Sequence, residues 1–92
     1  MKSYASIGEI DDYTVCEVEL NDTDESKTLS AREKKTSMVE FNTQAIINCV
    51  GSISEGDILV VEQEEGRILV IYGKDEEEKQ RRINLLRRLM AK

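Results

Sequence analysis

Carboxylates are the commonest side chains in this 92-residue sequence that could perform chemistry. Many of the 19 acidic residues gather in four groups: Asp11 and Asp12; Asp22, Asp24 and Glu25; Glu62, Glu64 and Glu65; and 75–78. Paired carboxylates held in a cleft can act as general acid and base or bind hard cations. Each group falls in an expected turn or at an expected helix start, where capping and solubility explain it. We therefore expect no enzymatic activity and no catalytic residue.

One segment is spaced somewhat like a calcium-binding loop. Counted from Asp22, Asp24 is third, Ser26 is fifth and Glu33 is twelfth, and these positions supply oxygen ligands in such loops. The sixth position of a calcium loop is glycine because the chain turns sharply there, but here it is Lys27. A strand is expected before the segment, where a calcium loop follows a helix. We therefore predict no metal site.

The sequence offers few residues for nucleophilic or cofactor chemistry. It has no His and no Trp, and its two cysteines are Cys16 and Cys49. His-based triads and His metal sites are therefore excluded, and two thiols are only half of a four-cysteine zinc site. The five glycines are isolated, so the sequence has no glycine-rich phosphate-binding loop. We expect no cofactor and no small-molecule substrate.

The first residues do not have the pattern of a secretory leader. Met1 and Lys2 lead directly into a strand-like segment instead of an apolar stretch of about 7 to 15 residues. The longest apolar runs, 58–61 and 68–72, are far shorter than the roughly 18 residues that cross a bilayer. The sequence therefore predicts a cytoplasmic protein with reduced cysteines and no membrane association.

Five segments have the pattern of β-strands: about 4–10, 13–20, 37–41, 57–62 and 67–72. Within 13–20 the residues alternate, which places Cys16 on the inner face. The turn sequences at 11–12 and 64–66 join neighbouring strands into hairpins. Apolar residues on both faces of the last two strands predict that both faces are covered, by barrel closure or by a helix packed outside. The expected core residues are Val18, Phe41, Leu59, Val61, Leu69 and Ile71.

Two connecting segments differ in character. Residues 21–37 are polar, with Leu29 and Ala31 as the only aliphatic side chains, and so they offer little apolar surface to offset the entropy of ordering. We predict a mobile polar loop there, with contact to a partner as the alternative. Residues 44–50 fit either a strand or one to two turns of helix.

The C-terminal segment, about 75–91, has the pattern of an amphipathic helix. Asp75 is the expected N-cap, and Glu78 completes a capping box three residues later. Arg82 points into the apolar face, so we expect it either to extend over the rim or to pair with a carboxylate of the body. The apolar face contains Ile83, Leu85, Leu86, Leu89 and Met90, and beyond its edge lie Arg81, Arg88 and Lys92.

The predicted elements form a single domain, 1–92, that is mainly β with α+β character. We expect a small five-stranded antiparallel SH3/OB-like barrel or curled sheet with one C-terminal amphipathic helix. Its charge is uneven: the formal net charge is −6, but residues 79–92 contain six bases and no acid. Residues 1–78 therefore hold the other seven of the 13 bases and all 19 acids, a net charge of −12. Such a body disfavours general binding to a phosphate backbone, which depends on basic residues that displace counterions.

Several short segments occur in a characteristic order: Ile-Gly-Glu-Ile (7–10), Tyr-Thr-Val-Cys-Glu (13–17), Glu-Gly-Asp-Ile-Leu (55–59), Arg-Ile-Leu-Val-Ile-Tyr (67–72) and a helix that begins Asp-Glu-Glu-Glu (75–78). This order resembles a family of small bacterial domains of unknown function, most strongly over 55–89. The polar stretch 21–37 and the Tyr-Gly-Lys at 72–74 depart from the family pattern. The resemblance implies a domain without an agreed activity that occurs alone or appended to larger proteins, including metallo-β-lactamase-like hydrolases. It implies no functional residue.

The composition and the C-terminal helix favour a non-catalytic interaction or accessory module. We expect it to bind a protein partner, or a second copy of itself, through the helix. The expected contact residues are Arg81, Leu85, Arg88, Leu89 and Lys92. The alternative is a module that binds single-stranded nucleic acid through the basic helix and the surface tyrosines Tyr4, Tyr13 and Tyr72. Mimicry of a nucleic acid by the acidic body is a further hypothesis.

Overall fold

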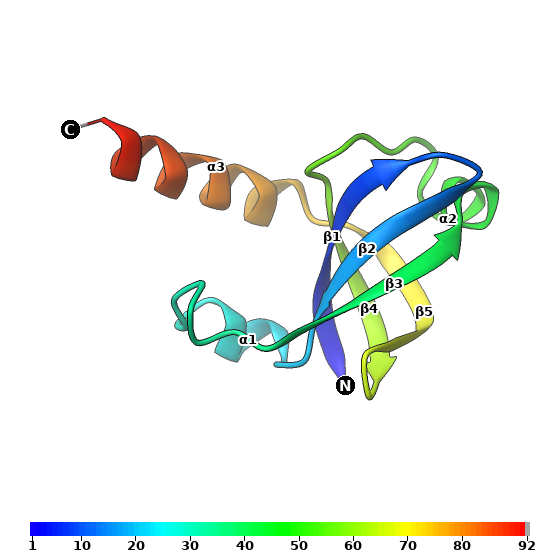
Figure 1. Cartoon of the computed structure of the whole chain (residues 1–92), viewed down its shortest axis with the longest axis horizontal. Coiled ribbons are helices and arrows are strands. Elements are labelled where there is room, and N and C mark those ends of the chain that lie inside the picture. Colours follow the sequence, from blue (N-terminus) through cyan, green and yellow to red (C-terminus); the bar gives the residue numbers. More distant parts are fainter. Residues whose placement is uncertain (92) are drawn as a thin grey trace.

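The predicted strands form one antiparallel sheet in the computed structural model, which describes residues 1–91 (Figure 1). The five strands of the described chain are β1 (Lys2–Ile10), β2 (Tyr13–Glu19), β3 (Thr36–Asn42), β4 (Ile58–Glu64) and β5 (Arg67–Lys74). Its helices are α1 (Thr23–Ser26), α2 (Thr43–Val50) and α3 (Glu76–Met90). The prediction of a mainly β fold with a C-terminal helix is confirmed.

The strand order places β1 at the centre of the sheet. The order is β3-β2-β1-β4-β5, with β1 paired antiparallel to β2 on one side and to β4 on the other. The sheet curls, so that the edge strands β3 and β5 become the two sides of a half-open barrel (Figure 1). The segment 44–50, which fits either a strand or a helix by sequence, belongs to α2 and lies against both edge strands. The result is a partly open, OB-like barrel of the predicted kind.

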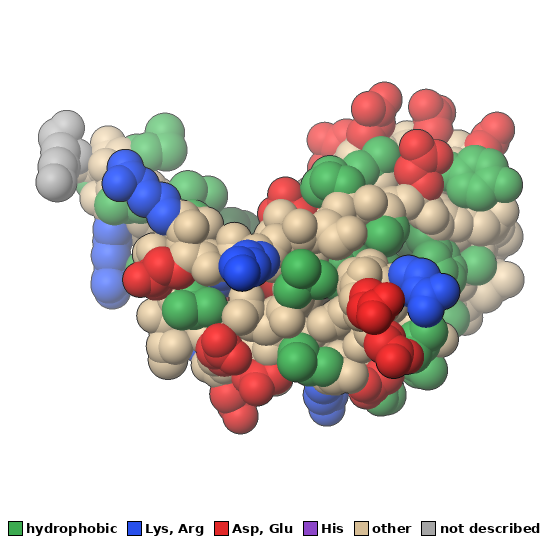
Figure 2. Space-filling view, turned by 60° about the horizontal axis from the view of Figure 1, so that its bottom comes forward, with side chains coloured by type: hydrophobic (Ala, Val, Ile, Leu, Met, Phe, Trp, Pro, Cys, Tyr) green, Lys and Arg blue, Asp and Glu red, His purple; other side chains and the backbone are tan. Residues whose placement is uncertain are grey.

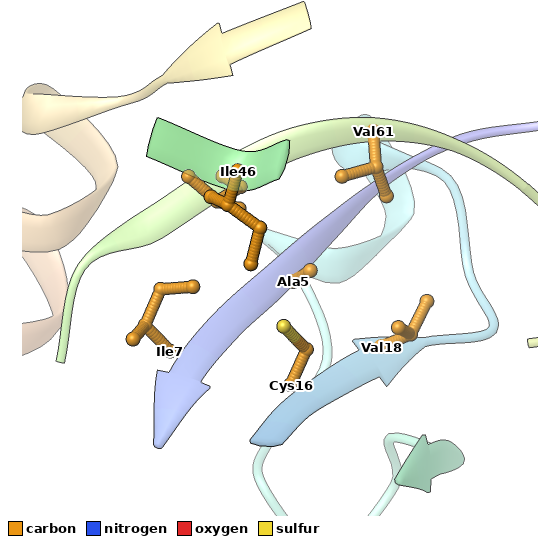
Figure 3. Packing of buried hydrophobic residues seen from close by; sticks show 7 residues of the cluster. Ala5, Ile7, Cys16, Val18, Ile46 and Val61 are labelled. Atoms are coloured by element: carbon orange, nitrogen blue, oxygen red, sulfur yellow. The ribbon is translucent and has the colours of Figure 1, made fainter. Parts of the chain in front are cut away.

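The inner face of the sheet carries the core. It is built from buried side chains of β1 (Ala5, Ile7), β2 (Cys16, Val18) and β4 (Leu59, Val61). Ile46 of α2 is fully buried against them (Figure 3). The predicted inward orientation of Cys16 is confirmed, and burial raises the pKa of its thiol to about 11. The thiol of Cys16 is therefore protonated at neutral pH and acts as a small apolar side chain.

Most of the predicted core positions contact the core. Val18, Leu59 and Val61 are buried, and Phe41 and Ile71 are partly buried against the same cluster. The prediction for Leu69 is wrong, because its side chain is 55% exposed. Ile68 pairs with Gln63 and Val70 pairs with Glu62, so Leu69 is the unpaired residue of a β-bulge. Leu69 and Val70 both face solvent. The sequence predicts that both faces of this hairpin are covered, but these two residues of β5 are not.

The polar stretch 21–37, predicted as a mobile loop, folds against the sheet. Asp22 caps α1 by accepting a hydrogen bond from the Glu25 N–H at 2.7 Å. The side chain of Ser26 is fully buried, α1 lies against β1, and β3 begins at Thr36. Local hydrogen bonds thus compensate for part of the apolar contact that this segment lacks.

The β4–β5 turn closes one end of the open side of the barrel. Glu65 and Gly66 both have positive φ angles, 54° and 85°, as a two-residue type I′ turn requires. A Cβ added to Gly66 would lie 2.6 Å from the Cβ of Ser37 at the edge strand β3. The turn can therefore approach β3 this closely only because residue 66 is glycine.

Replacing Gly66 with alanine should destabilise the barrel more than replacing Gly56. Gly56 also has a positive φ, 88°, but a Cβ there would meet nothing within 4 Å. Both substitutions strain the backbone, by about 1 kcal/mol, whereas only Gly66→Ala adds the clash with Ser37, which we expect to cost about 1–3 kcal/mol more. Urea unfolding of the two variants measures the difference. Equal losses would show that the turn does not contact β3.

Candidate functional site

α3 begins at the predicted N-cap. The Asp75 carboxylate accepts a hydrogen bond from the Glu78 N–H at 2.9 Å. The first turn carries three glutamates, which the positive end of the helix dipole stabilises. The reciprocal half of the predicted capping box is wrong, because the Asp75 N–H donates to the Ile58 carbonyl at 2.8 Å. The Glu78 carboxylate instead contacts the arginines one turn further along α3.

Arg82 joins α3 to the sheet. Its Nε donates to Glu78 Oε2 at 2.7 Å, and its Nη1 and Nη2 donate to the two carboxylate oxygens of Glu19 at 2.7 and 3.2 Å. Arg81 makes two hydrogen bonds to Glu78, at 2.8 and 2.7 Å. The Arg82 guanidinium also lies 5.1 Å from the centroid of the Tyr4 ring, a cation–π contact. The predicted pairing of Arg82 with a carboxylate of the body is confirmed, and we call these five residues the anchor.

The anchor is buried as well as charged. Glu19, Glu78 and Tyr4 are each 2% exposed. Burial by itself raises the pKa of Glu78, but the hydrogen bonds and charges of Arg81 and Arg82 outweigh it and lower this pKa to about 2. Removing one partner from such a cluster leaves a buried charge without compensation, which is strongly destabilising. The anchor therefore holds the first turns of α3 in one position.

Two further ion pairs support the anchor. The Lys79 Nζ lies 2.6 Å from the carboxylate of Asp57, which is 5% exposed and also accepts a hydrogen bond from the Ser54 N–H at 2.8 Å. The Lys34 Nζ lies 3.7 Å from the Glu19 carboxylate. The loop before β4 and the polar stretch before β3 thus both contribute charged side chains to the base of α3.

Beyond the anchor, α3 projects away from the barrel (Figure 1). Four large apolar side chains become increasingly exposed toward its end: Leu85 (42%), Leu86 (58%), Leu89 (72%) and Met90 (82%). We call these four residues the α3 strip. Leu85 and Leu89 follow Glu78 and Arg82 at spacings of three or four residues, so the α3 strip continues the face that docks on the sheet. Only the first turns of α3 are packed on the barrel.

A second surface lies at the β1–β2 turn. A cavity of about 430 Å³ is lined by Glu9, Asp11, Asp12, Tyr13, Val15 and Glu40, which we call the acidic groove. None of its four carboxylates forms an ion pair within residues 1–91. Figure 2 shows acidic side chains gathered at the end of the body away from the C-terminal end of α3. The acidic groove thus combines uncompensated negative charge with a 56% exposed tyrosine.

The structure separates the predicted contact residues. Leu85 and Leu89 belong to the α3 strip, and Arg88 is exposed and forms no ion pair in the described part of the chain. Arg81 belongs to the anchor, where its guanidinium is paired with Glu78. Lys92 lies outside the described residues. Of the predicted basic face, Arg81 therefore holds α3 on the sheet, whereas Arg88 is exposed.

The three tyrosines have different environments. Tyr13 and Tyr72 are 56% and 54% exposed, whereas Tyr4 is covered by Arg82 and is 2% exposed. The prediction that Tyr4 can stack on a base is therefore wrong. Tyr72 donates a hydrogen bond to the Glu62 carboxylate at 2.9 Å, and Lys2 lies 5.2 Å from the centroid of its ring.

The acidic residues of 21–37 contact their own backbone. Asp22 caps α1, and the Glu33 carboxylate accepts a hydrogen bond from the Ser30 N–H at 2.7 Å. In residues 1–91, His, Cys, Asp and Glu do not gather in groups of three or more that could hold a metal ion. In the same range, the helices are too short or too polar to span a bilayer.

Sequence reasoning missed Glu19 and the acidic groove. Alternation along 13–20 assigns Glu19 to the solvent face, but Arg82 and Lys34 lie over its carboxylate and bury it. The one signal for this contact is the presence of Arg82 on an otherwise apolar helix face. The groove combines residues of three strands and a turn, which no local pattern brings together.

Comparisons with protein-family models, with curated proteins and with solved structures give no match. The resemblance to the family of small bacterial domains therefore stays a prediction. The candidate site is defined by its own geometry: the anchor, the α3 strip and the acidic groove.

Glu78→Gln should weaken the anchor in a pH-dependent way. The pKa of Glu78 is about 2 in the folded state against an ordinary value of 4.5, so its charge stabilises the fold above pH 4.5 and this contribution is lost as the pH falls toward 2. At neutral pH we expect the variant to lose about 2–4 kcal/mol of unfolding free energy. The difference from the wild type should shrink to under about 1 kcal/mol near pH 2.

Urea unfolding at several pH values measures this difference. Glu77→Gln is the matched control, because Glu77 is an exposed neighbour in the same turn of α3 and makes no ion pair within residues 1–91. We expect the control to lose less than about 0.5 kcal/mol of unfolding free energy at any pH. A loss for Glu78→Gln that does not change with pH would contradict the assigned role of the carboxylate charge.

Proposed function

We propose that this protein is a non-catalytic interaction module that binds a protein surface through the α3 strip. The partner is another protein or a second copy of the chain. The observation that carries the proposal is the abrupt change along α3, from a buried charged anchor to four exposed apolar side chains on the same face. A contiguous exposed apolar patch of this kind is typical of an interaction site.

The length of α3 supports the same conclusion. α3 has 15 residues, and its second half contacts little of the barrel. Isolated helices shorter than about 12–15 residues are marginal in water, so an amphipathic helix gains most of its stability by packing its apolar face. A partner on the α3 strip would supply that packing.

The anchor makes the α3 strip a prepared binding surface. Because Arg82 is bonded to both Glu19 and Glu78, the direction in which α3 leaves the barrel is set before a partner arrives. Preorganisation of this kind reduces the ordering entropy that binding would otherwise cost.

Single-stranded nucleic acid is the second candidate ligand. The exposed Arg87 and Arg88 on α3 and the exposed Tyr13 and Tyr72 favour it. The evidence against it is that Arg81 and Arg82 are already paired with carboxylates and that Tyr4 is covered. In fluorescence anisotropy with a labelled single-stranded oligonucleotide at about 50 mM salt, we expect at most weak binding, with Kd above about 100 μM. Binding at low micromolar Kd that Arg87→Ala/Arg88→Ala abolishes would support the nucleic-acid function.

Site-specific photo-crosslinking tests the protein-binding function. A photo-reactive residue at Leu89, in the α3 strip, should form a discrete covalent adduct in cells of the source organism. The same residue at Arg67, an exposed position on β5, serves as the control and should give only background. An adduct of dimer mass identifies a second copy, and a different discrete mass identifies another protein. Equal background at both positions would contradict the proposed function.

A further inference from the structure

The exposed half of α3 and the acidic groove are complementary surfaces on one chain. Arg87 and Arg88 lie in the last turn of α3, next to the α3 strip, and form no ion pair within residues 1–91. The acidic groove offers four carboxylates that are also unpaired in that range, around a cavity of about 430 Å³. We propose that the second half of α3 from one copy docks in the acidic groove of a second copy. This inference rests on the proposed function and names its partner.

Charge favours this pairing over the two pairings of like surfaces. Four carboxylates around one cavity repel one another, and a neighbouring cation relieves that repulsion. Arg87 and Arg88 would bring two guanidinium groups, which suit bidentate contacts with carboxylates. The opposite pairing, groove against groove, would bring eight carboxylates together, and pairing the basic ends of two helices would bring like charges together.

The apolar parts of the two surfaces also match. Tyr13 is 56% exposed at the groove and Val15 is half-buried beside it. The α3 strip would cover these side chains while its own leucines are removed from water. A contact with an apolar centre and charged rims is the usual composition of a protein interface.

The two surfaces cannot meet within one molecule. The β1–β2 turn lies on the far side of the barrel from the C-terminal end of α3 (Figure 1). The anchor and the Lys79–Asp57 ion pair hold the base of α3, so the helix cannot fold back to the groove. Docking therefore requires a second copy, and the assembly that we propose is the dimer in which two such contacts are reciprocal and related by a two-fold axis.

Light scattering on a size-exclusion column measures the mass. A dimer has twice the 10.5 kDa mass of the chain. Because exposed ion pairs are screened by salt, we expect the dissociation constant of the dimer to rise about ten-fold between about 50 and 300 mM salt. A wild-type chain that stays monomeric from about 1 μM to 1 mM would overturn the inference.

Charge reversal identifies the surfaces. Arg87→Glu/Arg88→Glu and Asp11→Lys/Asp12→Lys should each weaken dimerisation at least about ten-fold. Combining all four substitutions in one chain should restore part of the dimerisation, because the two acids at positions 87 and 88 then face two lysines, while Glu9 and Glu40 keep the groove neutral overall. Glu55→Lys/Glu64→Lys is the matched control: it changes the net charge as Asp11→Lys/Asp12→Lys does, at exposed positions outside the groove, and should leave the dimer intact.

A different set of results would keep the proposed function and overturn this inference. In that set, Leu86→Glu/Leu89→Glu abolishes the dimer, whereas Asp11→Lys/Asp12→Lys and high salt leave it unchanged. The α3 strips of two copies would then pair with each other, without the groove. If the wild type is monomeric, the crosslink at Leu89 decides separately whether another protein binds the α3 strip.

Discussion

The contact of Arg82 with Glu19 and Glu78 is the interaction on which the arrangement of this molecule depends. The chain leaves β5 at Lys74, and without this contact α3 would be held mainly by its cap and by the Lys79–Asp57 pair. A buried ion cluster gives little net stability, because desolvation of the charges offsets most of their attraction. The cluster instead fixes geometry. The hydrogen bonds between the guanidinium and the carboxylates can form in only one orientation, and this orientation sets the direction of α3.

A polar anchor also explains why the α3 strip is left exposed. Amphipathic helices usually dock through their apolar face and leave charges in solvent. In α3 the docking part of the face is charged and its continuation is apolar, because Leu85 and Leu89 follow Glu78 and Arg82 along one side. The barrel supplies Glu19 and the ring of Tyr4 as the docking surface, and it ends before the leucines begin. The apolar surface of the helix is thus available for another chain.

The sequence predicts the sheet well because its signals are local. Alternation along β2 predicts that Cys16 and Val18 face the core, and the apolar run 58–61 predicts the same for Leu59 and Val61; both signals depend on near neighbours, and all four residues are buried. Leu69 was not predicted correctly, because a bulge depends on the pairing partner rather than on residue type. The cap at Asp75 was also visible in the sequence. The burial of Glu19 was not, because it is produced by an arginine 63 residues away.

The same distinction between local and long-range signals applies to the candidate site. The α3 strip follows from helical periodicity, but its exposure does not, because periodicity shows that a helix has an apolar face and not what covers that face. The acidic groove was hidden for a related reason: Glu9 and Asp11 lie near in sequence, whereas Glu40 joins them only through the pairing of β3 with β2. The groove forms only when β1, β2 and β3 are paired, and α3 takes its direction only from Glu19 of the folded sheet. A docked dimer would therefore require that both barrels be native.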